Sequence, residues 1–157
     1  MSAMSHYLQQ YDLTFSPTWS AYRLLGKRLF DLAVILPIFL VISPVLLLAA
    51  VLIKLDSRGP VLFNQERLGR YGETFLTCKF RTMTHREREA TAEILPGHSE
   101  VTRVGHWLRR FKIDEMPQLL NIVNGDMSLV GPRPALPDHI ADYNEAGLRR
   151  LLERPGL

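Results

Sequence analysis

The apolar positions of this chain are concentrated in one segment near its beginning. Residues 32–53 read LAVILPIFLVISPVLLLAAVLI and contain no charged side chain. As a helix this segment would be roughly 33 Å long, about the thickness of the hydrocarbon core of a bilayer. A soluble core helix of this length needs a larger protein to cover it, and a signal peptide has a shorter apolar region nearer the N-terminus. The pattern therefore predicts a membrane helix.

Two features bear on how this segment enters the membrane. Pro44, preceded by Ser43, lies at its middle and removes the N–H that would bond the carbonyl of Leu40. Basic residues flank both ends, whereas a single span has them mainly on the cytoplasmic side. They are Arg23, Lys27, Arg28, Lys54, Arg58, Arg67 and Arg70. A helix that breaks at Ser43–Pro44 and returns to the same face would satisfy both observations. Prolines are also tolerated in spanning helices, so composition leaves both arrangements open.

A β-hairpin is predicted next, over residues 61–83, with Gly69 and Gly72 at its bend. In its second strand Lys79 and Arg81 are two residues apart, so the period of a strand places them on one face. On pattern alone a solvated sheet edge is the simpler interpretation of these two residues. Residues 84–101 predict a short exposed helix and a loop broken by Pro96-Gly97.

Residues 102–113, TRVGHWLRRFKI, predict an amphipathic helix. Its apolar positions at helical spacing are Val104, Trp107, Leu108 and Phe111. An aromatic stripe with a basic rim suits a helix on an anionic membrane surface, and it also suits an ordinary helix that packs on a core. The membrane segment nearby favours the interfacial interpretation.

A second helix is predicted over residues 114–125, with Asp114 at the N-cap, Pro117 in the first turn and Gly125 at the end. The expected buried stripe is Met116, Leu119, Leu120 and Val123. Acidic residues such as Asp114 and Glu115 are common at helix starts because they complement the dipole and the free N–H groups. The same position favours the ionised carboxylate that a nucleophile needs. Two adjacent carboxylates beside a phosphate could also hold Mg²⁺, and spacing alone does not choose among these roles.

Arg133 lies between Pro132 and Pro134. The two prolines fix the backbone, so this loop either presents one guanidinium to phosphate oxygens or is a generic proline-rich turn.

Composition adds only broad limits. The chain has 157 residues, with 19 Lys and Arg against 16 Asp and Glu, for a net charge of +3. This mild basicity does not indicate a nucleic-acid partner. A single cysteine, Cys78, excludes a disulfide scaffold. Residues 1–20 are polar with scattered aromatic residues and predict an N-terminal arm.

In series, these segments resemble the bacterial sugar transferase family, the monotopic phosphoglycosyl transferases that start glycan assembly. The resemblance covers about residues 26–157. It rests on KRLFDL, the apolar segment with Ser43-Pro44, FNQERLGRYGETF, KFRTM, TRVG, IDEMPQLLN and GDMSLVGPRP, in this order.

The resemblance implies an α+β, mainly helical, monotopic membrane protein. A re-entrant helix and interfacial amphipathic helices would surround a small β-hairpin. The expected organisation is an N-terminal arm at residues 1–20, a re-entrant membrane helix at residues 21–56 broken at Ser43-Pro44, and a cytosolic interfacial catalytic domain at residues 57–157. The implied location is the cytoplasmic face of the bacterial inner membrane, in contact with membrane lipids.

The resemblance also implies the chemistry. A sugar-1-phosphate would pass from a nucleotide-diphosphate sugar, expected to be a UDP-sugar, to polyprenyl phosphate (undecaprenyl phosphate), with Mg²⁺ and release of a nucleoside monophosphate. This would be the first membrane step of exopolysaccharide, capsule, O-antigen or glycoprotein glycan assembly. Asp114 maps to the family's nucleophile, and Glu115 to the partner that assists it and helps hold the metal. Lys79, Arg81 and Arg133 map to phosphate or nucleotide contacts.

The chain departs from the family pattern in three places. Residues 98–101 read HSEV where an Asp-Pro-Arg-like run is usual. The extra N-terminal spans of larger members are missing, so a minimal catalytic form is expected. The chain ends just after Arg154-Pro155-Gly156, where the family continues, so we expect a catalytic domain truncated at its C-terminus.

Two other classes of function account for part of the sequence. A non-catalytic, membrane-anchored binding module explains residues 21–113 equally well. It gives no reason for Asp114-Glu115 and Pro132-Arg133-Pro134 to follow in this order. A transmembrane transferase of another fold would need more than one apolar segment.

Overall fold

The computed structural model describes residues 17–84, 101–138, 143 and 145–157. Its elements in chain order are α2 (Pro17–Asp56), β1 (Leu62–Leu68), η1 (Arg70–Gly72), β2 (Thr74–Phe80), α3 (Arg103–Arg110), η2 (Ile113–Gln118), α4 (Leu119–Asn124) and α5 (Glu145–Arg150). The predicted α+β, mainly helical architecture with a small β-hairpin is confirmed. The predictions for residues 1–16 and 85–100, including residues 98–100 of the departure from the family pattern, lie outside the described residues.

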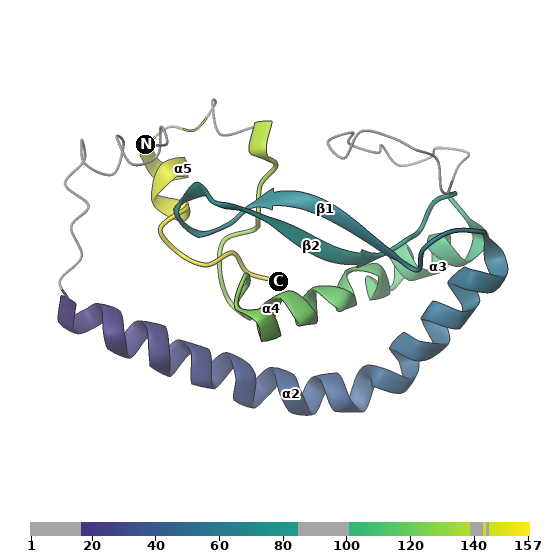
Figure 1. Ribbon diagram of the computed structural model, residues 1–157, viewed down its shortest axis with the longest axis horizontal. Helices are drawn as coiled ribbons and strands as arrows, with labels where there is room; N and C mark the ends of the chain where they lie inside the picture. Colours follow the sequence, from purple (N-terminus) through teal and green to yellow (C-terminus); the bar gives the residue numbers. More distant parts are fainter. Residues whose placement is uncertain (1–16, 85–100, 139–142, 144) are drawn as a thin grey trace.

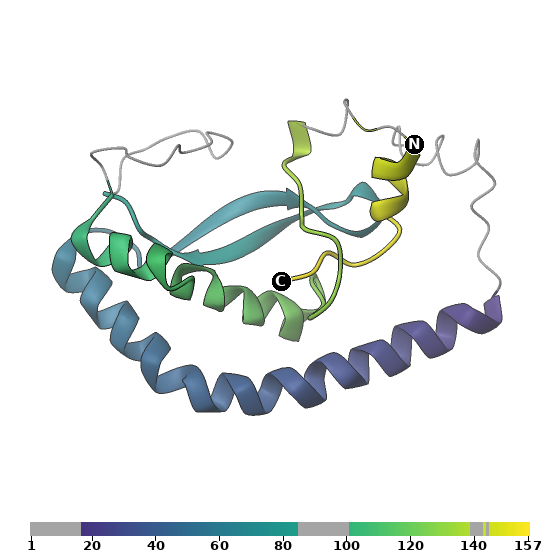
Figure 2. The same ribbon diagram turned by 180° about the vertical axis from the view of Figure 1, so that it is seen from behind.

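Helix α2 forms a long arc beneath the rest of the chain (Figure 1). It continues through Pro37 and Pro44 without interruption, so the predicted break takes the form of a bend. Both ends of α2 lie on the same side of its middle, and the hairpin and the short helices occupy the concave side in both views (Figures 1 and 2).

The helix stays continuous at Pro44 because a neighbouring side chain replaces the missing hydrogen bond. Pro44 has no N–H for the carbonyl of Leu40, one turn earlier. The Ser43 hydroxyl donates to that carbonyl at 2.8 Å. The Ser-Pro pair therefore permits a bend without leaving a bare carbonyl in apolar surroundings.

Two separate small cores attach α2 to the rest of the chain, one on each side of the bend. The first joins its N-terminal half to α4 and the loop that follows, and consists of Ile35, Leu119, Ile122 and Met127. The second joins its C-terminal half to the end of β2 and to α3, and consists of Ala49, Ile53, Phe80 and Leu108. Between the cores, the side chains of Leu40 and Val41 are 75% and 76% exposed.

Most of the apolar surface of α2 is uncovered. Over Leu25–Asp56 the helix is long and apolar enough to cross a membrane, and only 11% of its most apolar window is buried. Exposed apolar surface of this extent marks contact with a membrane or with another protein. Together with its length and hydropathy, it indicates a membrane location for this helix.

The N-terminal half of α2 also carries three charged residues that contact the rest of the chain, Lys27, Arg28 and Asp31, which we call the clasp. Arg28 donates from both terminal nitrogens to carbonyls in the last turn of α4, those of Ile122 and Val123. Lys27 Nζ donates to the Val130 carbonyl at 2.6 Å. The buried Asp31 carboxylate accepts from the Ser128 hydroxyl at 2.8 Å and the Leu129 N–H at 3.1 Å. The clasp thereby fixes α2 against the loop that leads to Arg133.

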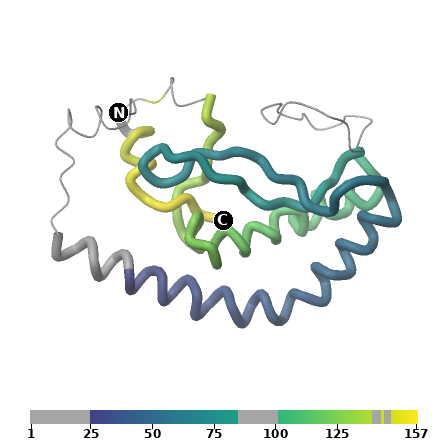
Figure 3. Tube along the Cα trace, viewed as in Figure 1, coloured from purple at the N-terminus to yellow at the C-terminus, as the bar shows by residue number. Residues whose placement is uncertain are grey.

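Strands β1 and β2 pair antiparallel, from Leu62 opposite Phe80 to Leu68 opposite Thr74. The bend lies between Gly69 and Gly72, as predicted, with Tyr71 at φ 60° in the left-handed region. The end of the chain supports this bend, because the Tyr71 N–H donates to the Leu151 carbonyl at 2.5 Å. Figure 3 shows that the same C-terminal segment then runs to the loop after α4.

Helix α3 begins where the sequence predicts, since the Thr102 side chain accepts from the Gly105 N–H at 2.9 Å. Its apolar stripe is divided. Leu108 is buried in the second core, whereas Trp107 and Phe111 are each 58% exposed and stack with ring centroids 5.7 Å apart. The exposed aromatic pair is the part of the stripe that remains free for a membrane surface.

The second predicted helix is confirmed in place and corrected in detail. Its first part is the 3-10 segment η2, and Lys112 rather than Asp114 holds the N-cap position, without a side-chain cap bond. A 3-10 turn has fewer residues per turn than an α-helix, so the buried face shifts. Leu119 is buried as expected, whereas Leu120 of the expected stripe is 38% exposed and Ile122 is buried instead. Gly125 ends the helix at φ 99°, as predicted.

Candidate active site

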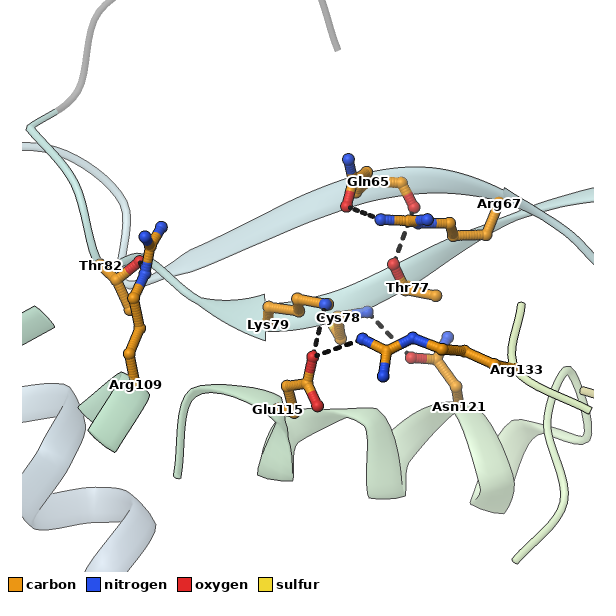
Figure 4. A network of polar contacts seen from close by, with 10 residues as sticks. All are labelled: Gln65, Arg67, Thr77, Cys78, Lys79, Thr82, Arg109, Glu115, Asn121 and Arg133. Carbon is orange, nitrogen blue, oxygen red and sulfur yellow. Dashed lines mark hydrogen bonds and ion pairs between the residues drawn. The ribbon is translucent and has the colours of Figure 1, made fainter. Parts of the chain in front are cut away.

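A cluster of charged side chains forms where three elements meet. Glu115 comes from η2, Lys79 from β2 and Arg133 from the loop after α4 (Figure 4). Lys79 Nζ is 2.9 Å from Glu115 Oε1, and Arg133 reaches the same oxygen at 3.8 Å. We call these residues, with the adjacent Asp114, the active-site cluster.

The basic residues of this cluster differ in exposure. The Lys79 side chain is 20% exposed and that of Arg133 is 85% exposed. A solvated sheet edge therefore does not describe Lys79. The Arg133 guanidinium projects into solvent and can meet a soluble anion.

The Asp114 carboxyl is partly buried. Burial raises its pKa above its ordinary value, and the negative charge of Glu115 raises the pKa further, against the opposing charges of Lys79 and Arg109. Its Oδ1 atom is buried and has no hydrogen-bond partner among the described residues. A carboxylate oxygen without a partner is available to a substrate atom or a cation.

Glu115 behaves in the opposite way. Burial alone would raise its pKa, but the hydrogen bond and charge of Lys79, with the charges of Arg133 and Lys112, hold the pKa below its ordinary value. Two adjacent carboxyls thus differ, because one has its charge neutralised by partners and the other does not. Such a pair suits a division of roles between neighbouring acids.

The donor set fits Mg²⁺. This ion takes oxygen ligands and is usually held by one or two carboxylates together with substrate phosphates. The partnerless Oδ1 of Asp114 and the carboxylate of Glu115 provide that number. Within residues 17–84, 101–138, 143 and 145–157, no group of three or more His, Cys, Asp and Glu side chains is assembled for a metal. The protein would therefore supply the two carboxylates, and the remaining ligands would come from substrate and water.

Arg81 lies elsewhere. Its side chain is 5% exposed, and one terminal nitrogen donates to the carbonyl and the hydroxyl of Ser57, each at 2.8 Å. Strand β2 ends at Phe80, so the strand period that relates it to Lys79 no longer applies. Its Nε and other terminal nitrogen are buried without partners among the described residues.

Two residues near the site did not stand out in the sequence. Arg109 donates to the Thr82 hydroxyl at 2.8 Å and its charge acts on Asp114. Asn121 is buried and bonds the backbone of β2 at Cys78 and Leu76. In the sequence Arg109 looks like part of a basic rim. Asn121 is a polar residue in an apolar helix and the last residue of the IDEMPQLLN block, two signals that could have found it.

The loop that carries Arg133 is held by the end of the chain. Ser128 and Gly156 form a parallel bridge, and the Gly156 N–H donates to the Pro132 carbonyl at 2.8 Å. The backbones at Gly131 and Gly156 approach so closely that a Cβ on Gly156 would lie 2.4 Å from the Gly131 oxygen. Neither glycine can be replaced without moving this loop.

Comparison with known proteins places the chain in a family. The family model described as bacterial sugar transferase matches residues 22–157. The sugar transferase EpsL of Bacillus subtilis, described as uncharacterized, is 42% identical over 131 residues, which are 83% of this chain and 64% of that protein. An undecaprenyl-phosphate glucose phosphotransferase of Komagataeibacter xylinus is 47% identical over 120 residues, 75% of this chain and 23% of that protein.

A third relative is a UDP-glucose:undecaprenyl-phosphate glucose-1-phosphate transferase of Caulobacter vibrioides. It is 47% identical over 138 residues, which are 85% of this chain and 51% of that protein. The chain therefore spans less than two thirds of the length of these relatives. Because the family model covers most of the chain, the protein belongs to the bacterial sugar transferase family.

Proposed function

We propose that this protein transfers a sugar-1-phosphate from a nucleotide-diphosphate sugar to a polyprenyl phosphate. The observation that carries the proposal is the buried, partnerless oxygen of Asp114 beside a Glu115 whose charge is already neutralised. The relatives support the two substrates, because their names include UDP-glucose and undecaprenyl phosphate. We take a UDP-sugar as donor and undecaprenyl phosphate as acceptor.

The reaction would run in two steps. A carboxylate oxygen of Asp114 attacks the phosphorus next to the sugar, and the bond from that phosphorus to the oxygen of the nucleoside monophosphate breaks. The phosphosugar is then bound to Asp114 as an acyl phosphate. An oxygen of the polyprenyl phosphate attacks the same phosphorus, and the carboxylate of Asp114 leaves. Splitting the transfer in this way lets a soluble donor and a lipid acceptor react separately.

The remaining charged groups have supporting roles. Mg²⁺, held by Asp114 and Glu115, would neutralise charge on the diphosphate when bound. Lys79 orients Glu115 and offers its ammonium to the donor phosphates. Arg133 contacts the same phosphates from the solvent side. Arg81 keeps its proposed substrate role only if an anion can reach its two partnerless nitrogens beside Ser57.

The membrane arrangement is part of the proposal. A re-entrant α2 would place both of its ends, and the catalytic residues within its arc, at the cytoplasmic face of the inner membrane. The bend of α2 and the exposed aromatic pair of α3 support this arrangement. An acceptor that cannot leave the membrane would then meet Asp114 at the interface.

Mass spectrometry tests the chemistry. Protein incubated with Mg²⁺ and a panel of nucleotide-diphosphate sugars, without lipid, should carry a phosphosugar adduct on the peptide that contains Asp114. The adduct should be absent from Asp114→Asn and should disappear when polyprenyl phosphate is added. A non-catalytic binding module, the alternative, would give no adduct and no nucleoside monophosphate with any donor.

Cysteine labelling tests the topology. In a Cys78→Ser background, Ser20→Cys and Arg58→Cys should react with a membrane-impermeant reagent from the same, cytoplasmic, side. Pro44→Ala should straighten α2 toward a span and move one label to the other side. Labels on opposite sides in the unsubstituted helix would contradict the re-entrant arrangement.

A further inference from the structure

Asn121 makes the polar connection between α4 and the hairpin. Its side chain is buried, with 5% of its surface exposed. Its Oδ1 accepts from the Cys78 N–H at 2.9 Å (Figure 4). Its Nδ2 donates to the Leu76 carbonyl at 2.7 Å. Nδ2 also lies 3.2 Å from Asp126 Oδ2, which orients the amide.

These two backbone groups belong to the outer edge of the hairpin. Leu76 and Cys78 pair with Glu66 and Asn64 of β1, and in an antiparallel pair alternate residues direct their N–H and C=O groups away from the partner strand. A carboxamide has the same donor and acceptor as a peptide group. The Asn121 side chain therefore takes the place that a third strand would occupy.

The two hydrogen bonds between Asn121 and β2, which we call the joint, lie next to the ion pair of the active-site cluster. Lys79 directly follows Cys78 on β2, and η2, which carries Glu115, runs straight into α4, which carries Asn121. The Lys79–Glu115 pair of 2.9 Å spans the same gap between the two elements. Any slip of β2 along α4 would change that distance.

The ion pair cannot set the distance by itself. Its two side chains are 20% and 30% exposed, and ion pairs of partly exposed, flexible side chains contribute little to holding a geometry. Asn121 is buried and short, with its donor and acceptor both used. We propose that Asn121 is a positioning residue that sets Lys79 against Glu115 for the sugar-phosphate transfer; this proposal rests on the proposed function.

One measurement does not depend on catalysis. In Asn121→Ala, hydrogen exchange at the Cys78 amide should be about 2- to 10-fold faster, the range expected for loss of one buried hydrogen bond. Asn124→Ala is the matched control, because Asn124 is an exposed residue of the same helix, and it should leave this amide unchanged. Equal exchange in wild type and Asn121→Ala would overturn the joint itself.

The second measurement is a double-mutant cycle on kcat/KM in the full chain. Asn121→Ala should lower kcat/KM by up to about 100-fold when Lys79 is present, as small misplacements of catalytic groups do. In a Lys79→Met background it should lower kcat/KM less than about 3-fold, because the group that it positions is gone. A purely structural role would give the same loss in both backgrounds.

The outcomes separate this proposal from the proposed function. An inactive wild-type protein would contradict the proposed function. The hydrogen-exchange experiment would then still test whether Asn121 bonds the Cys78 amide. An active protein with additive losses would contradict the positioning role alone. If Asn121→Ala does not fold, Asn121→Asp replaces it, since Asp keeps the volume and the acceptor for Cys78. Failure of both to fold would contradict a local positioning role.

Discussion

The clasp on α2 and the active-site cluster use the same residue types in different ways. In the clasp, Lys27 and Arg28 donate to backbone carbonyls, and the Asp31 carboxylate accepts from the Ser128 hydroxyl and the Leu129 N–H. In the active-site cluster the partners are other side chains. Lys79 and Arg133 share one oxygen of Glu115, and Asp114 Oδ1 has no partner among the described residues.

The difference separates a structural cluster from a reactive one. Buried polar groups stabilise a fold only when they are satisfied, and backbone partners provide this without requiring other side chains to be held in place. A site that must bind a ligand needs donors or acceptors that the protein's own contacts leave unused. Substitutions in the clasp should therefore lower stability, and substitutions in the active-site cluster should lower activity.

The largest expected effect is on activity at Asp114. Asp114→Asn should abolish transfer, because an amide is not a nucleophile that can form the acyl phosphate. Folding should be retained, since Asp114 makes no N-cap bond that the fold depends on. Release of nucleoside monophosphate from the donor is the measurement. Asp138→Asn, at an exposed position, is the control and should keep full activity; normal turnover in Asp114→Asn would refute the mechanism.

The clasp should show the reverse pattern. Asp31→Ala leaves the Ser128 hydroxyl and the Leu129 N–H without their partner, at about 1–3 kcal/mol for each unpaired group. We expect a loss of about 2–6 kcal/mol in the free energy of unfolding, measured in detergent against Asp138→Ala. The fraction that remains folded should retain phosphosugar adduct formation. Loss of adduct without loss of stability would place the clasp in the reaction and erase the distinction.

Lys79 and Arg133 should have smaller effects than Asp114. Lys79→Met and Arg133→Met would each remove one charge-assisted hydrogen bond to the donor phosphates, worth roughly 1.5–3 kcal/mol, so kcat/KM should fall about 10- to 150-fold. Arg150→Met, at an exposed position on α5, is the matched control. Unchanged kinetics in both variants would leave the Lys79–Glu115 pair a structural contact and assign Arg133 to the solvated surface.

Substitution of Arg81 tests whether one residue can both stabilise the fold and bind the substrate. Arg81→Met removes the two hydrogen bonds to Ser57, so a loss of stability of about 1.5–3 kcal/mol is expected. A substrate role would add a rise in the donor KM for the folded fraction. Unchanged KM together with lower stability would make Arg81 a structural residue.

The smallest effect concerns pH. Burial and the Glu115 charge raise the pKa of Asp114 in the folded chain, so the folded state binds this proton more tightly than the unfolded state. Stability contributed by this carboxyl is then present at low pH and is lost as pH rises through the raised pKa. In metal-free protein, Asp114→Asn should unfold at a higher temperature than wild type at neutral pH. The gain should vanish in acid, and a gain that is independent of pH would contradict the assigned cause.

The local structure of this protein could be predicted from the sequence better than its long-range contacts could. The hairpin bend at Gly69 and the helix end at Gly125 follow from local propensities and were predicted, and α3 begins within one residue of the start that its apolar spacing predicts. Asp114 was misplaced as an N-cap because a 3-10 start cannot be told from an α-helical one by acidic residues and a proline.

Within the site, the family resemblance singled out Asp114, Glu115 and Lys79, but no pattern predicted that Lys79 would bond Glu115. That contact joins elements that are far apart in the chain, and only tertiary packing determines it. The role of Asn121, although it closes the IDEMPQLLN block, was missed for the same reason. Its partners are backbone groups of β2, and backbone groups leave no trace in a sequence.

The clasp also has a consequence for the order of events during synthesis. Lys27 and Val130 are 103 residues apart, and Asp31 and Ser128 are 97 apart. When α2 leaves the ribosome, none of the groups that will hold its N-terminal half has been translated. The clasp can therefore close only after the loop beyond α4 emerges, with the entropic cost of closing a long loop. Until then the apolar surface of the new helix is without these contacts, and lipid is the environment that its length and hydropathy suit.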